Sequence, residues 1–400
     1  MISADSHFVQ APHMWSSWLP RQYRDRAPQL VDDGDGGEGW LFAGWDKPEP
    51  IGLQGLPGRP ADNLRPSGVR YDEIRRGTYD GAARLQDQEE DGVDGEVIFP
   101  TSHPIDHFLD DPDRDFVMAG VAAYNNFVKE EFCAPAPHRL FPVAQLPTTG
   151  VADCISVLED AAARGFVAAS LPSWPDGGDQ LSAETADFWA CAQELGLPIC
   201  MHVGFRGRKE RIARREVSVQ RSYASSKEIS AAFGHEDQAV PLPLEYHRKL
   251  PNFGVGLARA APVLSDLLLS GIFDVYPRLR IGLIETWVGW VPRALEAVDD
   301  IWERNRHLRR LPLRYPPSTY WHTNMVSSFI DDRAGIQLRN AVGIENMMWS
   351  SDYPHIVTFW PRSRKVVENS FLGVSGDDRT KILRQNCINF YGLGNRIATA

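Results

Sequence analysis

The chain has 400 residues, of which 43% are hydrophobic and 24% charged, and its formal net charge is −11. These values are typical of globular enzymes with a large buried core. A negatively charged chain is a poor partner for nucleic acid or for an anionic membrane, because both require a cationic face. We therefore expect a small-molecule substrate.

The cysteines, at positions 133, 154, 191, 200 and 387, are odd in number. Their spacing matches neither a zinc ribbon nor a disulfide framework, so it fits a reducing compartment. The chain begins with Ile2-Ser3-Ala4-Asp5, which does not resemble a signal sequence, and it contains no run of eighteen apolar residues. We expect a cytoplasmic protein without a membrane span.

The N-terminal part of the sequence predicts a strand, a long insertion and a helix. Residues 1–7 form a short strand, and 12–28 an irregular aromatic-rich segment. Residues 32–70 are rich in Gly, Pro and Asp without periodicity, which is typical of a lid or a subunit contact. An acidic helix over 80–94, with Ala82, Ala83, Leu85 and Val93 on one face, leads into an apolar strand at 95–100.

Helices and short apolar strands alternate through the rest of the chain. Helices are predicted at 119–132, 151–164, 183–195, 258–271, 292–306, 332–342 and 377–386, and strands at 139–146, 166–171, 197–202, 279–285, 318–325 and 346–351. A polar stretch at about 205–255 interrupts the alternation. Eight strands, beginning near residues 2, 95, 140, 166, 198, 280, 319 and 346, predict an α/β fold: a (β/α)8 TIM barrel with two large loop insertions, in a single domain over residues 1–400.

Polar residues stand where four of these strands end. Asp5 and His7 follow the first strand, and the others are His202, Glu285 and Asp352. The carboxyl ends of the strands share one face of a barrel, so these side chains should lie close together. A buried carboxylate needs a cation, and imidazole nitrogen with carboxylate oxygen suits Zn(II) or Mn(II). The sequence therefore predicts a metal site with an open position for water or substrate.

Seven segments together resemble the metal-dependent amidohydrolase superfamily. Within it they resemble the amidohydrolase-related branch, which includes aminocarboxymuconate semialdehyde and hydroxybenzoate-type decarboxylases. The segments are Asp5-Ser6-His7, 75–80, 91–94, His202-Val203-Gly204, 271–277, Glu285 with 289–292, and Ser351-Asp352-Tyr353-Pro354-His355. They span nearly the whole chain, in the expected order.

The resemblance implies a ligand set of Asp5, His7, His202 and Asp352 around one divalent ion, with Zn(II) our first choice and Mn(II) the alternative. The family most often has His where Asp5 stands, so Asp5 either binds the ion or orients His7. Binuclear members use a modified Lys on the fourth strand. Residues 166–171 contain no Lys, so we expect a single ion.

Glu285 departs from the decarboxylases of this branch, which place a His before Gly-Gly at this strand end. Glu285 is either a general base or proton donor, or a structural carboxylate paired with Arg259 or His322. His322, on the expected strand 318–325, is a candidate to point into the barrel. His355 either orients Asp352 or contacts substrate.

The predicted function is that of a mononuclear metal-dependent hydrolase acting on a small carboxylated or aromatic substrate, in which Asp352, Glu285 and His355 are the catalytic residues. The alternative is a non-oxidative decarboxylase, and a second alternative is a non-catalytic metal-binding barrel. Three tryptophans are candidates to line an aromatic pocket: Trp287, Trp290 and Trp360. We also expect a homodimer formed through insertions such as 32–70.

Overall fold

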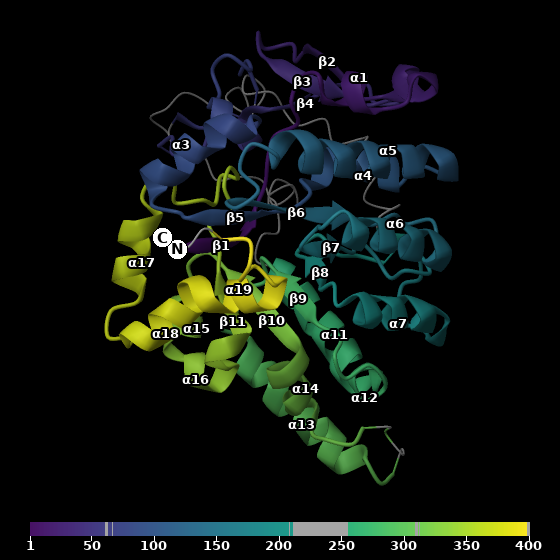
Figure 1. Ribbon diagram of the computed structural model, residues 1–400, viewed down its shortest axis with the longest axis vertical. Coiled ribbons are helices and arrows are strands. Elements are labelled where there is room, and N and C mark those ends of the chain that lie inside the picture. The colour runs from purple at the N-terminus through teal and green to yellow at the C-terminus, as the bar shows by residue number, and fades with distance from the viewer. Residues whose placement is uncertain are drawn as a thin grey trace, which may run out of the picture.

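The computed structural model of the chain describes residues 1–60, 63–65, 67–207, 209–210, 255–308, 311 and 313–397. Eight parallel strands form one sheet, with helices arranged outside it (Figure 1). In order, they are β1 (Ile2–Ser6), β5 (Gly95–Ile98), β6 (Leu140–Gln145), β7 (Ala168–Ser170), β8 (Ile199–His202), β9 (Ile281–Ile284), β10 (Met325–Phe329) and β11 (Met347–Trp349).

Backbone hydrogen bonds join the segment after β11 to β1. The Asp352 amide donates to the Asp5 carbonyl at 3.1 Å, and the His7 amide donates to the Tyr353 carbonyl at 2.7 Å. The sheet thereby curls into a barrel whose last contact lies beside the polar strand ends. The predicted (β/α)8 barrel is confirmed.

The longer outer helices connect successive strands. The helices are α1 (Met14–Trp18), α2 (Gly52–Gly55), α3 (Gly81–Asp91), α4 (Ser102–Leu109), α5 (Arg114–Phe127), α6 (Val151–Ala163), α7 (Ala186–Leu195), α11 (Val255–Leu269), α12 (Ile272–Val275), α13 (Val291–Asn305), α14 (Pro317–Asn324), α15 (Arg333–Gln337), α16 (Arg339–Val342), α17 (Ser363–Ser370), α18 (Gly376–Thr380) and α19 (Asn386–Tyr391). Phe390 and Tyr391 of α19 belong to the same buried cluster as Val97 and Ile284. Because Arg280, just before β9, donates to the Phe390 carbonyl at 2.7 Å, α19 covers the amino-terminal end of the barrel.

The insertion at 32–70 contains secondary structure that the sequence pattern did not predict. An antiparallel sheet of β2 (Gln29–Asp32), β3 (Glu38–Leu41) and β4 (Glu49–Pro50) lies at the top of Figure 1. Trp40 and Phe42 anchor it in the main core. The second expected insertion, at about 205–255, falls mostly outside the described residues.

The prediction of a strand at 318–325 is wrong. Residues Pro317–Asn324 form helix α14, and the strand begins at Met325. Proline at the first helical position suits a helix start, since its fixed φ is helical and its missing N–H is not needed there. His322 therefore lies on a helix, exposed, with Nδ1 3.3 Å from Asn346 Oδ1, and does not point into the barrel.

The predicted apolar face of the helix at 80–94 is wrong within the helix itself, although Val93, just after it, is buried in the core. Helix α3 exposes Ala82 and half-buries Ala83 and Leu85, whereas Arg84 and Gln88 are buried against the barrel. The pattern was misleading because the buried side chains are polar and find partners only in the folded structure.

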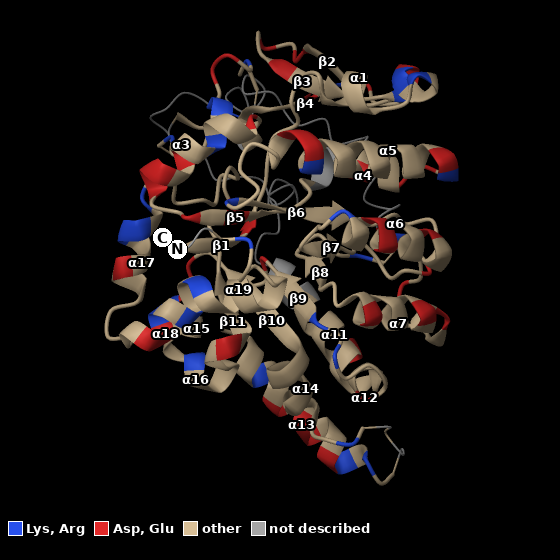
Figure 2. Cartoon of the chain, viewed as in Figure 1, with Lys and Arg blue, Asp and Glu red and all other residues tan. Residues whose placement is uncertain are grey.

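Helix α13 carries charged residues of both signs, most of them acidic (Figure 2). They form ion pairs one helical turn apart, such as Arg304–Asp300 at 2.8 Å and Arg306–Glu303 at 3.0 Å, which is typical of a solvated helix face. Among the described residues, no helix combines the length and apolar character needed to cross a bilayer.

Candidate metal centre

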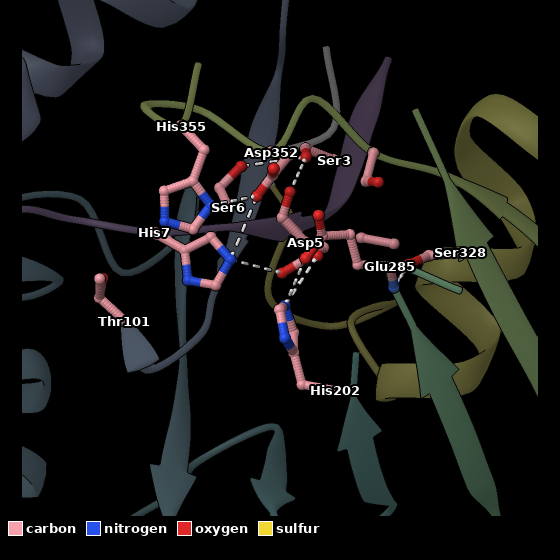
Figure 3. A network of polar contacts seen from close by, with 12 residues as sticks. Ser3, Asp5, Ser6, His7, Thr101, His202, Glu285, Ser328, Asp352 and His355 are labelled. Atoms are coloured by element: carbon pink, nitrogen blue, oxygen red, sulfur yellow. Dashed lines mark hydrogen bonds and ion pairs between the residues drawn. The ribbon is translucent and has the colours of Figure 1, made fainter. Parts of the chain in front are cut away.

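The carboxyl ends of the barrel strands bring six predicted site residues together (Figure 3). They come from the end of β1, the end of β8, the turn after β9 and the turn after β11, and are Asp5, His7, His202, Glu285, Asp352 and His355. These residues form three overlapping groups, and within each group the possible ligand atoms lie within 4.8 Å of one another. Segments up to 350 positions apart in sequence thus meet in one cluster because the barrel closes on itself.

An irregularity in β1 directs its polar side chains into the barrel. Ile2 and Ala4 pack in the interior cluster, so in a regular strand Asp5 and His7 would face outward. The pairing with β5 shifts register between Ser3 and Ser6. Such a bulge re-aims the side chains that follow it. It allows β1 to supply apolar interior residues and then two polar site residues on the same side.

The histidines and carboxylates contact one another without filling each other's hydrogen-bonding capacity. His7 Nε2 lies 3.4 Å from Asp5 Oδ1 and 3.2 Å from Asp352 Oδ1, and His202 Nε2 lies 3.3 Å from Asp5 Oδ2. The His7 and His202 rings meet edge to face, with centroids 5.1 Å apart. Both imidazoles therefore converge on Asp5 from different sides.

A divalent cation fits this cluster. Both Asp5 oxygens, both His7 nitrogens, His202 Nε2 and Asp352 Oδ2 are buried and have no hydrogen-bond partner among the described residues. Buried polar atoms of this kind are normally paired, because leaving them unpaired costs free energy. Two imidazoles and two carboxylates supply the donor atoms of a catalytic zinc or manganese site.

Glu285 lies beside this cluster, with Oε2 3.5 Å from His202 Nε2. Its backbone amide donates to Ser328 Oγ at 2.8 Å, and its φ of 58° is left-handed. Burial, followed by the charge of Asp352, raises the pKa of Glu285 to about 8 against the opposing effect of His202. Glu285 does not pair with His322, which is exposed and contacts Asn346. The other predicted partner, the side chain of Arg259, is not among the described residues.

His355 contacts Asp352 directly, with Nδ1 3.0 Å from Oδ1, and its ring stacks on His7 at 4.2 Å. Burial opposes ionisation of Asp352, but His355 and His7 outweigh it and hold its pKa well below the usual range. Asp352 also has a left-handed φ, of 50°. Such a conformation costs on the order of 1–3 kcal/mol in a non-glycine residue and is concentrated at functional sites.

Solvent reaches the cluster from one side. The side chains of His202, Glu285 and His355 are 17%, 14% and 23% exposed, whereas Asp5 and Asp352 are fully buried. A substrate can therefore approach past the first three residues.

The three candidate tryptophans differ in position. Trp287 and Trp290 lie in the turn after Glu285 and are half-buried, and Trp290 Nε1 donates to the Thr286 carbonyl at 2.8 Å. Trp360 is buried behind the barrel wall, where its Nε1 donates to the Asp87 carbonyl at 3.0 Å. It packs on Tyr353 and Arg75, so it supports the turn after Asp352 from behind and does not line the mouth of the site.

Several polar residues around the cluster were missed at the level of the sequence. Asp332 accepts from the Val288 and Gly289 amides at 2.8 and 2.7 Å and so fixes the turn after Glu285. Arg84 and Glu96 form a fully desolvated ion pair behind β1, at 2.8 Å. The available signal for Arg84 was the spacing of polar residues along α3.

The sequence matches the model of the family described as Amidohydrolase over residues 73–393. No curated protein sequence registers as a relative of the chain. The match extends from the segment before α3 to the end of α19 and agrees with the resemblance inferred from the strand-end residues.

Solved structures share the fold at low sequence identity. An amidohydrolase of Mycobacterium avium subsp. paratuberculosis K-10 is 17% identical with a TM-score of 0.68, covering 98% of both chains. A dihydroxybenzoic acid decarboxylase of Polaromonas sp. JS666, with bound manganese and 2-nitroresorcinol, is 16% identical with a TM-score of 0.59, covering 100% of this chain and 99% of the other. A 5-carboxyvanillate decarboxylase of Novosphingobium aromaticivorans DSM 12444, with bound manganese, is 15% identical with a TM-score of 0.62, covering 98% and 95%.

Proposed function

Because the chain belongs to the amidohydrolase family, we propose that it is a mononuclear metal-dependent hydrolase of a small carboxylated or aromatic organic substrate. The observation that carries this proposal is the position of Glu285. Its carboxyl group adjoins His202, belongs to one cluster with Asp5 and Asp352, and is reachable from solvent. This position, next to the candidate ligands and partly exposed to solvent, supports a proton-transfer role for Glu285.

Asp5, His7, His202 and Asp352 would hold the ion. A divalent ion in such a site polarises a carbonyl group and lowers the pKa of bound water. Zn(II) is our first choice, since imidazole and carboxylate are its usual ligands in catalytic sites. Mn(II) is the alternative, supported by the manganese bound in two similar structures.

Two carboxyl groups with opposite pKa shifts can divide the proton transfers between them. The lowered pKa of Asp352 keeps this carboxylate ionised, and its Oδ2 has no hydrogen-bond partner among the described residues, so Asp352 would be able to accept a proton from the attacking water. Glu285, whose pKa is raised, can hold a proton near neutral pH and donate it to the leaving group. Environments that separate the pKa values of two carboxyls are typical of acid–base pairs. His355 holds Asp352 in place at 3.0 Å.

Non-oxidative decarboxylation is the second candidate, and the raised pKa of Glu285 also supports it. When the bond between the substrate and its carboxyl group breaks, the electron pair stays on the substrate carbon and carbon dioxide leaves. A protonated Glu285 could deliver the proton that this carbon requires. Two of the similar structures are decarboxylases.

One incubation separates the two reactions. We would supply the metal-loaded protein with lactones, amides, vinylogous ketones and hydroxybenzoates in oxygen-18 water, then measure label in the product and carbon dioxide released. Label in a new carboxylate supports hydrolysis. Stoichiometric release of carbon dioxide, with no label in the product, would refute hydrolysis and support decarboxylation. Metal uptake with neither product would favour a non-catalytic binding protein. His202→Ala serves as the inactive control.

A further inference from the structure

Helix α3 packs against the barrel through a polar face. Its buried side chains Arg84, Asp87, Gln88 and Asp91 follow the i, i+3, i+4, i+7 spacing of one helix face. Outer helices normally turn an apolar stripe to the sheet, and buried polar groups lower stability unless they are hydrogen-bonded. The hydrogen-bond partners of this polar face therefore indicate which part of the barrel it stabilises.

Arg84 donates hydrogen bonds to the backbone at the point where the barrel closes. It is completely buried and donates through Nε to Glu96 at 2.8 Å. Its Nη2 donates to the His7 carbonyl and, at 3.4 Å, to the Tyr353 carbonyl. Since Tyr353 directly follows Asp352, one guanidinium joins the proposed ligand His7 to the residue next to the proposed ligand Asp352.

Glu96 extends this contact to the other side of the closure. Besides Arg84, it accepts from Gln88 Nε2 at 2.8 Å and from Ser6 Oγ at 3.2 Å. Ser6 Oγ lies 3.0 Å from Ser351 Oγ, and both hydroxyls contact Ser3 Oγ, at 3.0 and 3.1 Å. The chain of contacts thus reaches the residue immediately before Asp352.

Asp87 fixes the tyrosine between these groups. It accepts from the Tyr353 hydroxyl at 2.5 Å and from Arg75 Nη2 at 2.6 Å. The Arg84 guanidinium lies 4.3 Å from the centre of the Tyr353 ring. Side chains of α3 therefore contact the carbonyl, the ring and the hydroxyl of Tyr353, and so hold the turn that carries Asp352.

We propose that Arg84, supported by Glu96 and Asp87, is a positioning residue of the metal centre, which sets the separation of His7 and Asp352. The proposal rests on the metal site proposed above. Lysine should not replace Arg84, because an ammonium group is a single point, whereas the guanidinium fork reaches a carboxylate and two carbonyls in fixed directions. Mutation of a group that orients a metal ligand typically lowers metal affinity about 10- to 100-fold.

The test is cobalt(II) binding to metal-free protein, measured as affinity and as the visible absorption spectrum of the bound ion. Arg84→Lys should bind cobalt(II) about 10- to 100-fold more weakly, with a changed spectrum. The matched control is Arg339→Lys on α16. It alters a half-buried ion pair, in which Arg339 Nε lies 3.0 Å from Asp378 Oδ2, and should match the wild type in both measurements. Wild-type affinity and spectrum in Arg84→Lys would overturn the proposal, even if that variant melted at a lower temperature.

A second variant decides the matter if Arg84→Lys does not fold. Tyr353→Phe removes only the hydroxyl that Asp87 binds and leaves the ring in place. Its cobalt(II) affinity should fall about threefold to tenfold, the worth of one hydrogen bond, and an unchanged affinity would overturn the proposal. If the wild type itself takes up no cobalt(II), the metal site and the positioning role fail together, whereas equal binding by wild type and variants removes only the positioning role.

Discussion

Replacing Glu285 by Gln tests the residue on which the proposed chemistry depends. The substitution keeps the size of the side chain and its position 3.5 Å from His202 but removes the ionisable proton. A positioned proton-transfer group contributes about 100- to 10,000-fold to turnover, which corresponds to about 3–5 kcal/mol in the activation barrier. The four candidate ligands are untouched, so metal content should stay at about one equivalent.

In the metal-loaded protein, stability should change little on replacing Glu285 by Gln. The lost attraction to His202 and the relieved repulsion from Asp5 and Asp352 act in opposite directions. We expect the melting temperature to shift by less than about 1 °C, which for a chain of 400 residues is equivalent to about 1 kcal/mol. A structural carboxylate would instead show lower stability or metal content, with turnover per bound ion unchanged.

The assay measures turnover, bound metal and melting temperature on one preparation of each protein. Glu131→Gln is the matched control, since it alters a carboxylate–imidazole contact of 2.6 Å with His13 on the exposed surface. It should retain wild-type turnover. Full turnover with full metal content in Glu285→Gln would refute the reasoning and leave Asp352 and His355 as the groups that move the proton.

Three further predictions follow from the same geometry. His202→Ala should lose most of the bound metal, and elemental analysis that still finds one equivalent would remove His202 from the ligand set. Asp332→Ala leaves two backbone N–H groups near Glu285 unpaired and should lower the free energy of unfolding by about 2–5 kcal/mol in denaturant titration, with a change below about 1 kcal/mol refuting its role. In metal-free protein, the pKa of Glu285 is raised from 4.5 to about 8, so its stabilising contribution is complete at low pH and is lost as pH rises through 8. Glu285→Gln should therefore lose less stability than the wild type between pH 5 and 8, and equal losses would contradict the shift.

The sequence by itself determined the barrel. Alternating short apolar strands and helices allow few folds, and eight such units predict a closed parallel sheet. The polar residues that interrupt the apolar strands at their ends, such as His202 and Asp352, marked one face because all carboxyl ends of a parallel barrel point the same way. Local patterns carried this information, so no knowledge of the packing was required.

Local patterns failed where the deciding interaction is distant in sequence. The apolar residues Tyr320 and Trp321 resemble part of a strand, but their backbone forms α14, and the strand begins at Met325. The polar face of α3 has no visible purpose until Glu96, His7 and Tyr353 lie against it.

The tertiary structure also decided how the site is assembled. The register shift in β1 places Asp5 on the inner face, and strand pairing of this kind is set by the neighbouring strand. The final contact between Asp352 and Asp5 joins positions 347 residues apart. The sequence supplies the chemistry of these side chains, whereas barrel closure brings their oxygens and nitrogens close enough together to form the candidate metal centre.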